Sequence, residues 1–138
     1  MSEYRKPPKP PFYDGALPGQ CRVCGEYVLR SKGTINTRAN WHPKCLIEYK
    51  LIHWPRETRK AVWSRDKGAC ADCGCRCDKR GWELDHRKPL VEAKGRIEYW
   101  KLPNLQTLCR DCHRKKTSAE ATARAAARKK LKVSKPDK

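Results

Sequence analysis

Two closely spaced cysteine pairs constrain the fold of this chain more than any other feature of its sequence. The first pair is Cys70 and Cys73, and the second is Cys109 and Cys112. Four thiolates at this spacing can close one tetrahedral zinc site. The pattern therefore predicts a metal ion that ties together two segments far apart in the chain.

Two more thiols, Cys75 and Cys77, follow the first pair immediately. The spacing favours Cys70 and Cys73 as the zinc ligands and leaves Cys75 and Cys77 as free thiols on a loop. A switched ligand set that includes one of them, or a second metal, remains open from the sequence.

A second candidate zinc site lies upstream, where the pattern CxxC…HxxC comprises Cys21, Cys24, His42 and Cys45. Three thiolates and one imidazole form a common structural zinc site. Gly25 after the second cysteine fits the tight turn of a zinc knuckle. The alternative is two buried cysteine pairs without metal. Zinc is favoured over unliganded pairs because free thiols at this density, nine in a short polar chain, would otherwise have no role.

Composition limits the size of the core and the kind of partner. The chain has 138 residues, of which 38% are hydrophobic and 35% are charged, so a large core is not expected. Its 33 Lys and Arg against 15 Asp and Glu give a net charge of +18. This excess predicts a polyanionic partner, most simply the phosphates of nucleic acid. A merely solvated basic surface is disfavoured because the charge is spread along the whole chain.

The sequence shows neither a signal peptide nor an apolar run of transmembrane length. We therefore expect a cytoplasmic protein with reduced thiols and no membrane contact, in a bacterial host or a phage-infected cell.

Local patterns predict the secondary structure. Helices are expected from Pro43 to about Trp54 and from about Arg56 to Asp66, separated by Pro55. A short strand is expected at Trp82–His86, and residues 104–108 are predicted to form its partner strand or a turn. A last helix should begin at Asp111, continue through an Ala-rich basic stretch and fray after Leu131.

These patterns divide the chain into four parts. Residues 1–19 are predicted to be a flexible Pro/Lys-rich arm, and residues 20–54 an accessory zinc-binding segment with a helix. Residues 55–117 carry the second cysteine set and the conspicuous histidines. Residues 118–138 are expected to be a basic helical tail.

The order of motifs in the third part resembles the HNH endonucleases, in particular the small phage and bacterial type with a four-cysteine zinc site. The resemblance extends from about Trp63 to Thr117, and the upstream zinc segment more loosely resembles one that precedes this domain in some members. The motifs that carry it are Arg65-Asp66-Lys67-Gly68-Ala69-Cys70, Cys73-Gly74, Glu83-Leu84-Asp85-His86, Pro89-Leu90, Asn104-Leu105, Leu108-Cys109, Cys112-His113 and Lys116-Thr117. Each motif alone is weak, whereas the ordered set is highly specific.

The resemblance implies an α+β fold. Its centre would be a small zinc-stapled ββα-metal core (HNH, His-Me finger), preceded by a zinc-knuckle segment and two helices and followed by a basic helix. It also implies an endonuclease that hydrolyses DNA phosphodiester bonds, leaving 5′-phosphate and 3′-hydroxyl ends. His86 would be the general base, and Asp85 and His113 would hold one divalent metal. Asn104 would hold the loop and orient His86, although in some relatives the equivalent amide touches the metal.

The chemistry agrees with these residue types. Neutral imidazole suits activation of water near pH 7, and a carboxylate with one imidazole suits Mg²⁺ or Mn²⁺, with Ni²⁺ or Co²⁺ as further options. The alternative is that His86 and His113 are structural or support zinc, and that Asn104 only caps a turn. Glu83 shares a strand face with Asp85 and is either an extra carboxylate near the metal or, more simply, solvated.

Basic residues flank the predicted metal ligands, and we expect them to contact DNA phosphates. These are Arg87, Lys88, Arg110, Arg114, Lys115 and Lys116. Two alternative functions remain: a non-catalytic zinc-containing nucleic-acid-binding module, and a nuclease subunit of a larger phage DNA-processing machine. In the latter, the arm or the tail would contact a protein partner. The sequence leaves the oligomeric state, the cleavage sequence and the choice between nicking and double-strand cutting open.

Overall fold

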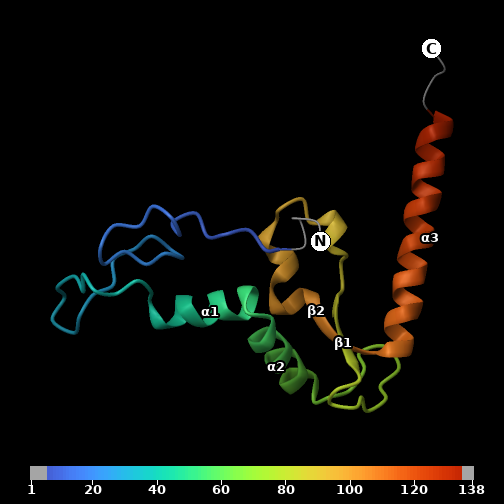
Figure 1. The fold of residues 1–138 in the computed structure, drawn as a ribbon, viewed down its shortest axis with the longest axis horizontal. Coiled ribbons are helices and arrows are strands. Elements are labelled where there is room, and N and C mark those ends of the chain that lie inside the picture. Colours follow the sequence, from blue (N-terminus) through green and yellow to red (C-terminus); the bar gives the residue numbers. More distant parts are fainter. Residues whose placement is uncertain (1–5, 135–138) are drawn as a thin grey trace.

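A two-stranded antiparallel ribbon lies between two packed helices and one long projecting helix. The computed structural model describes residues 6–134, with side chains up to Lys132. Helices α1 (Pro43–His53) and α2 (Pro55–Asp66) precede strand β1 (Trp82–His86). Strand β2 (Leu105–Cys109) leads directly into helix α3 (Arg110–Ser134), which rises along one edge of the molecule (Figure 1). The predicted α+β class is confirmed at this level.

The ribbon register places the residues of interest opposite one another. β1 pairs with β2 so that Asp85 faces Gln106 and His86 faces Leu105. Between the strands, residues 87–104 form a loop with three short 3₁₀ turns, Leu90–Glu92, Ile97–Trp100 and Leu102–Asn104. The segment that the sequence left as strand or turn is therefore the second strand, shifted by one residue from the expected range.

The main core forms where α2 packs on the ribbon. Val62, Trp82 and Leu105 are buried together, with Trp63 and Leu84 against them. Val62 comes from the apolar side of α2, and the other two come from alternate positions of the strands, as the helical and strand periods require. This small core fixes the orientation of β1, on which the candidate site is built.

A network of hydrogen bonds and one ion pair connects the end of α2 to β2. The Asp66 carboxylate accepts the Thr107 backbone N–H at 2.9 Å and pairs with Arg65 at 2.9 Å. The Arg65 guanidinium also donates to the Leu102 carbonyl at 2.7 Å. Burial alone would raise the pKa of Asp66, but the hydrogen bonds from Arg65 and Thr107 lower it below its usual range. The Arg65-Asp66 motif is thus a structural tie between α2 and the ribbon.

The described part of the N-terminal arm lies against α1. Tyr13 stacks on Tyr49 with ring centroids 5.8 Å apart, and Trp41 approaches Tyr49 at 5.1 Å. Residues 1–5 of the predicted flexible arm lie outside the described residues.

The C-terminal part of the chain is a single helix. The proposed boundary between residues 117 and 118 falls inside α3, which continues without a break to Ser134 instead of fraying after Leu131. Residues 135–138 of the tail lie outside the described part. Among the helices of residues 6–134, none has the length and apolar character needed to span a bilayer.

Candidate metal and nuclease site

Cys70, Cys73, Cys109 and Cys112 converge as the spacing predicted, with their sulfur atoms all within 4.8 Å of one another. The sulfur atoms of Cys73 and Cys109 are 3.9 Å apart. Two thiolates of a tetrahedral zinc site, each ~2.3 Å from the metal, lie about 3.8 Å apart. The cluster therefore has dimensions that fit zinc. It joins the loop after α2 to the junction of β2 and α3.

The upstream cluster has the same dimensions with a different ligand set. Cys21, Cys24, His42 and Cys45 place their ligand atoms within 4.8 Å of one another. His42 Nδ1 lies 3.4 Å from the Cys24 sulfur, while its Nε2 lies 3.2 Å from the carbonyl of Tyr27. A second hydrogen bond of this kind fixes the ring orientation of a metal-binding histidine. This cluster can also bind zinc.

Both CxxC turns share one backbone design. The amide of Gly25 donates to the Cys21 carbonyl at 2.9 Å, and Gly74 donates to the Cys70 carbonyl at the same distance. The two glycines have φ values of 80° and 77°, which L-residues with a side chain adopt at a cost. The tight turns direct backbone N–H groups toward the sulfur atoms.

These amides affect the thiol chemistry. Burial alone would raise the pKa of Cys21 and of Cys70, but hydrogen bonds from backbone groups lower each to about 6. In both turns the first cysteine is thereby prepared to lose its proton, which metal binding requires.

Cys75 and Cys77 take different positions around the second cluster. The carbonyl of Cys75 accepts the amide of Cys70 at 2.9 Å, while its side chain is exposed. Cys77 is partly buried and packs against the core residues of both the ribbon and the cysteine cluster. The four converging thiols are those that the spacing favoured, and Cys77 acts as a small apolar core side chain.

Asp85 and His113 meet across the ribbon and the first turns of α3. The Asp85 side chain is only 8% exposed, and its Oδ1 lies 3.9 Å from His113 Nε2. A divalent cation with ligand distances of ~2.1 Å is able to bridge two atoms at this separation. Carboxylate and imidazole also have the donor chemistry that such a cation requires, so this pair fits a metal.

Two polar groups hold the other oxygen of Asp85. Gln106 Nε2 donates to Asp85 Oδ2 at 2.8 Å, and Lys116 Nζ lies 3.2 Å from the same atom. Lys116 also donates to the His86 carbonyl at 3.0 Å and pairs with Glu120. The buried carboxylate is therefore oriented and charge-compensated before any metal binds.

Sequence reasoning had assigned no role to Gln106 and had placed Lys116 among the DNA contacts. Gln106 could have been found from its position in the second strand, because it lies opposite Asp85 once the two strands are aligned. Lys116 could have been found from its position one helical turn after His113, which places both side chains on the same face of the helix.

His86 ends β1 and is half-buried. Desolvation by this burial lowers the pKa of the imidazole below 6.5; the Asp85 charge opposes the shift and the Lys116 charge adds to it. The shift favours the neutral imidazole, the form that accepts a proton.

Asn104 forms hydrogen bonds that connect the two ends of the loop that follows His86. Its side-chain amide donates to the carbonyls of Tyr99 at 2.8 Å and Lys88 at 3.2 Å, and its Oδ1 accepts the Lys88 amide at 2.9 Å. Its backbone carbonyl accepts the Arg87 amide at 2.7 Å. These contacts support the prediction that Asn104 holds the loop.

The six predicted DNA-contacting residues separate into two groups. Lys116 faces Asp85 and is 24% exposed, whereas the other five are exposed: Arg87, Lys88, Arg110, Arg114 and Lys115. Arg110 and Arg114 share a hollow of about 360 Å³ with Glu83 and His113. Arg114 also pairs with Asp111 at 2.8 Å, and Glu83 lies on the wall of the hollow.

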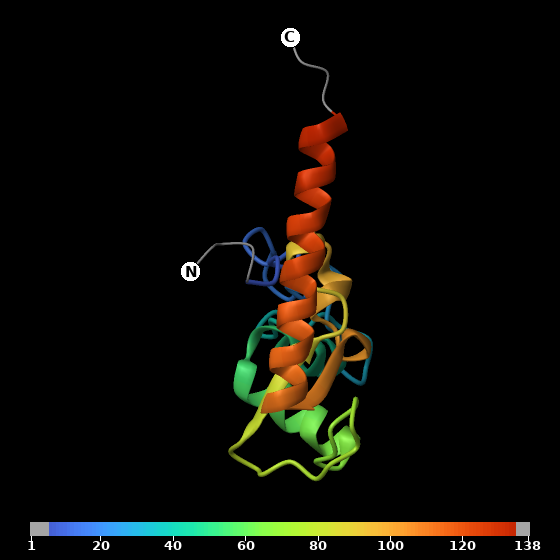
Figure 2. The same ribbon diagram turned by 90° about the vertical axis from the view of Figure 1, so that its right-hand side faces the viewer.

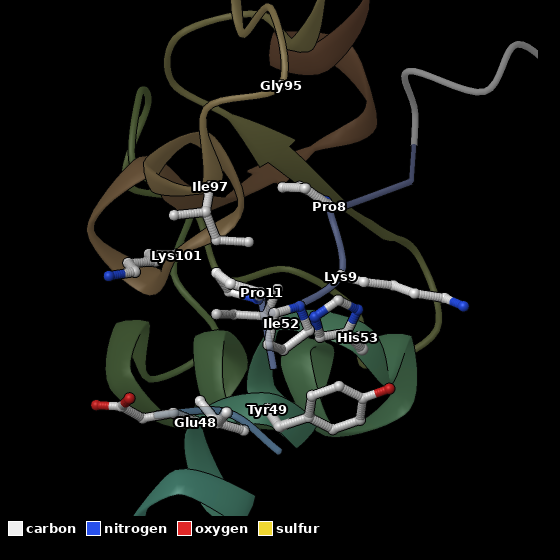
Figure 3. Close-up of a pocket in the computed structure, with 12 residues that line it drawn as sticks. Pro8, Lys9, Pro11, Glu48, Tyr49, Ile52, His53, Gly95, Ile97 and Lys101 are labelled. Carbon is white, nitrogen blue, oxygen red and sulfur yellow. The ribbon is translucent and has the colours of Figure 1, made fainter. Parts of the chain in front are cut away.

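A further cavity of about 390 Å³ lies between the arm, α1 and the loop around Ile97. Figure 3 shows Tyr49 and His53 of α1 at this cavity, with Pro11 of the arm nearby. None of the residues predicted for the catalytic site lines it. Burial lowers the pKa of His53, whose ring stacks on Tyr49 at 4.3 Å.

Comparison with known proteins agrees with this geometry. Residues 70–119 match the family described as HNH endonuclease. The matched segment contains the cysteine cluster, both strands and the start of α3. The resemblance to HNH endonucleases is thereby confirmed for this part of the chain.

Individual relatives also match part of the chain. A probable HNH endonuclease of Lactococcus phage SK1 is 39% identical over 64 residues, which is 44% of this chain and 65% of the phage protein. The DNA annealing helicase and endonuclease ZRANB3 of Mus musculus is 40% identical over 48 residues, 35% of this chain. The Homo sapiens protein of the same name is 39% identical over 54 residues. The matches span only 4% and 5% of these two long proteins. No solved structure matches the chain.

Proposed function

We propose that this protein is a metal-dependent DNA endonuclease that hydrolyses phosphodiester bonds and leaves 5′-phosphate and 3′-hydroxyl ends. The observation that carries the proposal is the approach of Asp85 and His113 to 3.9 Å, next to His86 and within the segment that matches HNH endonucleases. In this proposal the ββα-metal core consists of β1, β2 and α3, stapled by the second cysteine cluster.

The proposed mechanism assigns one task to each side chain. Asp85 and His113 would hold a single Mg²⁺ or Mn²⁺, or Ni²⁺ or Co²⁺, and the bound cation would stabilise negative charge on the phosphate and the departing 3′ oxygen. His86 takes a proton from water, so that the water oxygen forms a bond to phosphorus while the bond to the 3′ oxygen breaks. A solvent water molecule then gives a proton to the departing oxygen, which becomes the 3′-hydroxyl. Asn104 keeps the loop after His86 in place.

Electrostatics support a phosphate substrate at this position. The net charge of +18 attracts a polyanion, and Arg110 and Arg114 border the hollow beside His113. Lys116 and Gln106 hold Asp85 in the orientation that brings its other oxygen toward His113. In this proposal the ribbon and α3 together position the catalytic side chains.

The names of the relatives support the choice of substrate. The phage and mammalian relatives are named as endonucleases, and the names of the mammalian proteins also describe action on DNA. We propose DNA as the substrate, phosphate contacts as the main source of affinity, and action in the cytoplasm of a bacterial or phage-infected cell.

Supercoiled plasmid provides the test. Purified zinc-loaded protein should convert it to open-circle or linear DNA with added Mg²⁺, Mn²⁺ or Ni²⁺, and not without added cation. His86→Ala should abolish conversion, while Lys79→Ala, on an exposed loop outside the predicted site, should cut normally. Absence of cutting with every cation, together with tight DNA binding, would refute the catalytic proposal and favour a binding module or a subunit that needs its machine.

A further inference from the structure

The second half of α3 stands free of the rest of the molecule. In both views it extends well beyond the ribbon on which its first turns pack (Figures 1 and 2). From Thr117 to Lys132 every side chain except Glu120 is exposed. The segment is Ala-rich, and alanine has the highest helix propensity, so the helix forms without tertiary support.

This projecting segment is strongly basic. Residues 118–132 contain one acidic residue, Glu120, which pairs with Lys116. The basic residues are Arg124, Arg128, Lys129, Lys130 and Lys132. Its other residues are small, apart from Leu131, so phosphate groups can approach the helix closely.

Arg124 and Arg128 share the helix face of His113. At 3.6 residues per turn, positions 11 and 15 residues after His113 are displaced by about 20° and 60° from it around the axis. Lys129 and Lys130 are rotated by about 160° and 100° in opposite senses, away from this face. The rise of ~1.5 Å per residue places Arg124 about 16 Å and Arg128 about 22 Å along the helix from His113.

We propose that the projecting half of α3 binds duplex DNA beside the scissile bond, through phosphate contacts of Arg124 and Arg128. The inference rests on the proposed nuclease function, because His113 and the two arginines belong to one rigid helix. With base pairs spaced ~3.4 Å apart, these contacts would fall about five to seven base pairs from the cleaved phosphate. The helix thus extends the DNA footprint beyond the ribbon and contributes affinity without reading bases.

Two double variants with equal loss of charge test the inference. Arg124→Ala/Arg128→Ala removes the charges on the His113 face, and Lys129→Ala/Lys130→Ala removes two charges away from it. Alanine preserves the exposed helix, which circular dichroism verifies. Binding to a 30-base-pair duplex is measured by fluorescence anisotropy from 50 to 300 mM KCl, with all proteins in a His86→Ala background without added divalent cation.

The two variants should differ in both affinity and salt dependence. Loss of two phosphate contacts should reduce the slope of log K against log salt by about 1.8, with affinity at 100 mM salt about tenfold lower for Arg124→Ala/Arg128→Ala. The lysine variant should lower affinity less than threefold and leave the slope nearly unchanged. Equal slopes for the two variants, or no change in either, would overturn the inference.

The plasmid test separates this inference from the proposed function. If the wild-type chain cuts plasmid but the two double variants bind alike, the helix proposal alone fails. If the arginine variant binds DNA more weakly than the lysine variant but the wild type never cuts, the nuclease proposal fails while the helix contact stands.

Discussion

The two cysteine clusters are built on the same turn but are attached to different surroundings. Cys21 and Cys70 start equivalent turns with the same backbone hydrogen bonds and nearly equal glycine φ values. The first cluster joins loops to the start of α1, a helix with no buried residue. Two cysteines of the second cluster, Cys70 and Cys112, pack with Leu108 of β2. Cys112 lies in the first turn of α3, the helix that carries His113. One local motif thus serves a peripheral unit in one place and holds the candidate catalytic residues in the other.

The largest expected effect comes from breaking the second cluster. Cys109→Ser should lose one zinc per chain and unfold the ribbon, because zinc binding at such a site contributes ~10–16 kcal/mol, more than a small domain has in reserve. Metal analysis and near-ultraviolet circular dichroism measure both effects. A soluble Cys109→Ser protein with native tertiary signals would contradict the account.

Breaking the first cluster should have a smaller and separable effect. Cys24→Ser should also lose one zinc, yet keep the signals of the ribbon and plasmid cutting within a few-fold of wild type, because the core of Val62, Trp82 and Leu105 does not include this unit. Hydrogen exchange should show protection lost in residues 20–42 only. Loss of cutting to the level of Cys109→Ser would show that the clusters form one cooperative unit.

The segment that contains the second cluster also contains the proposed general base, His86, so the dependence of cutting on pH tests this region of the molecule. Burial lowers the pKa of His86 below 6.5, so the neutral base persists to lower pH than for a free histidine. The cutting rate should be constant near neutral pH and fall about tenfold per unit only below a midpoint under 6.5. Zinc content is checked at each pH. A midpoint above 6.5 would exclude His86 as the neutral general base in this environment.

The smallest effects concern the two extra thiols. Cys77→Ser places a hydroxyl in a partly buried apolar position and should lower the free energy of unfolding by about 1 kcal/mol. Cys75→Ser changes an exposed side chain and should cost less than about 0.5 kcal/mol. Both should retain the wild-type zinc content, measured beside denaturant unfolding. Loss of zinc from Cys75→Ser would establish Cys75 as a zinc ligand, in the switched ligand set that the sequence left open.

The sequence predicts most of what is local and little of what depends on tertiary contact. Cysteine spacing identifies both clusters because ligand number and spacing are properties of the chain. The strand at Trp82–His86 and the two proline-started helices follow from local patterns in the same way. Gln106 was missed because its contact with Asp85 depends on the register of the two strands.

Lys116 is a second residue whose role depends on tertiary contacts and could not be read from the sequence. A lysine in a basic run is indistinguishable in sequence from its solvated neighbours, and only the packing of α3 on β1 turns it toward Asp85. The single helix expected from Asp111 is confirmed as α3, which begins one residue earlier at Arg110 and extends to Ser134.

The most direct test of the central claim is titration of zinc-loaded protein with Mn²⁺, followed by electron paramagnetic resonance. The account predicts one Mn²⁺ site per chain that Asp85→Asn and His113→Ala each weaken at least tenfold. His86→Ala, which removes the proposed base but no metal ligand, should bind Mn²⁺ like the wild type. Equal Mn²⁺ affinity in wild type and Asp85→Asn would contradict the assignment of the metal site to the meeting point of β1 and α3.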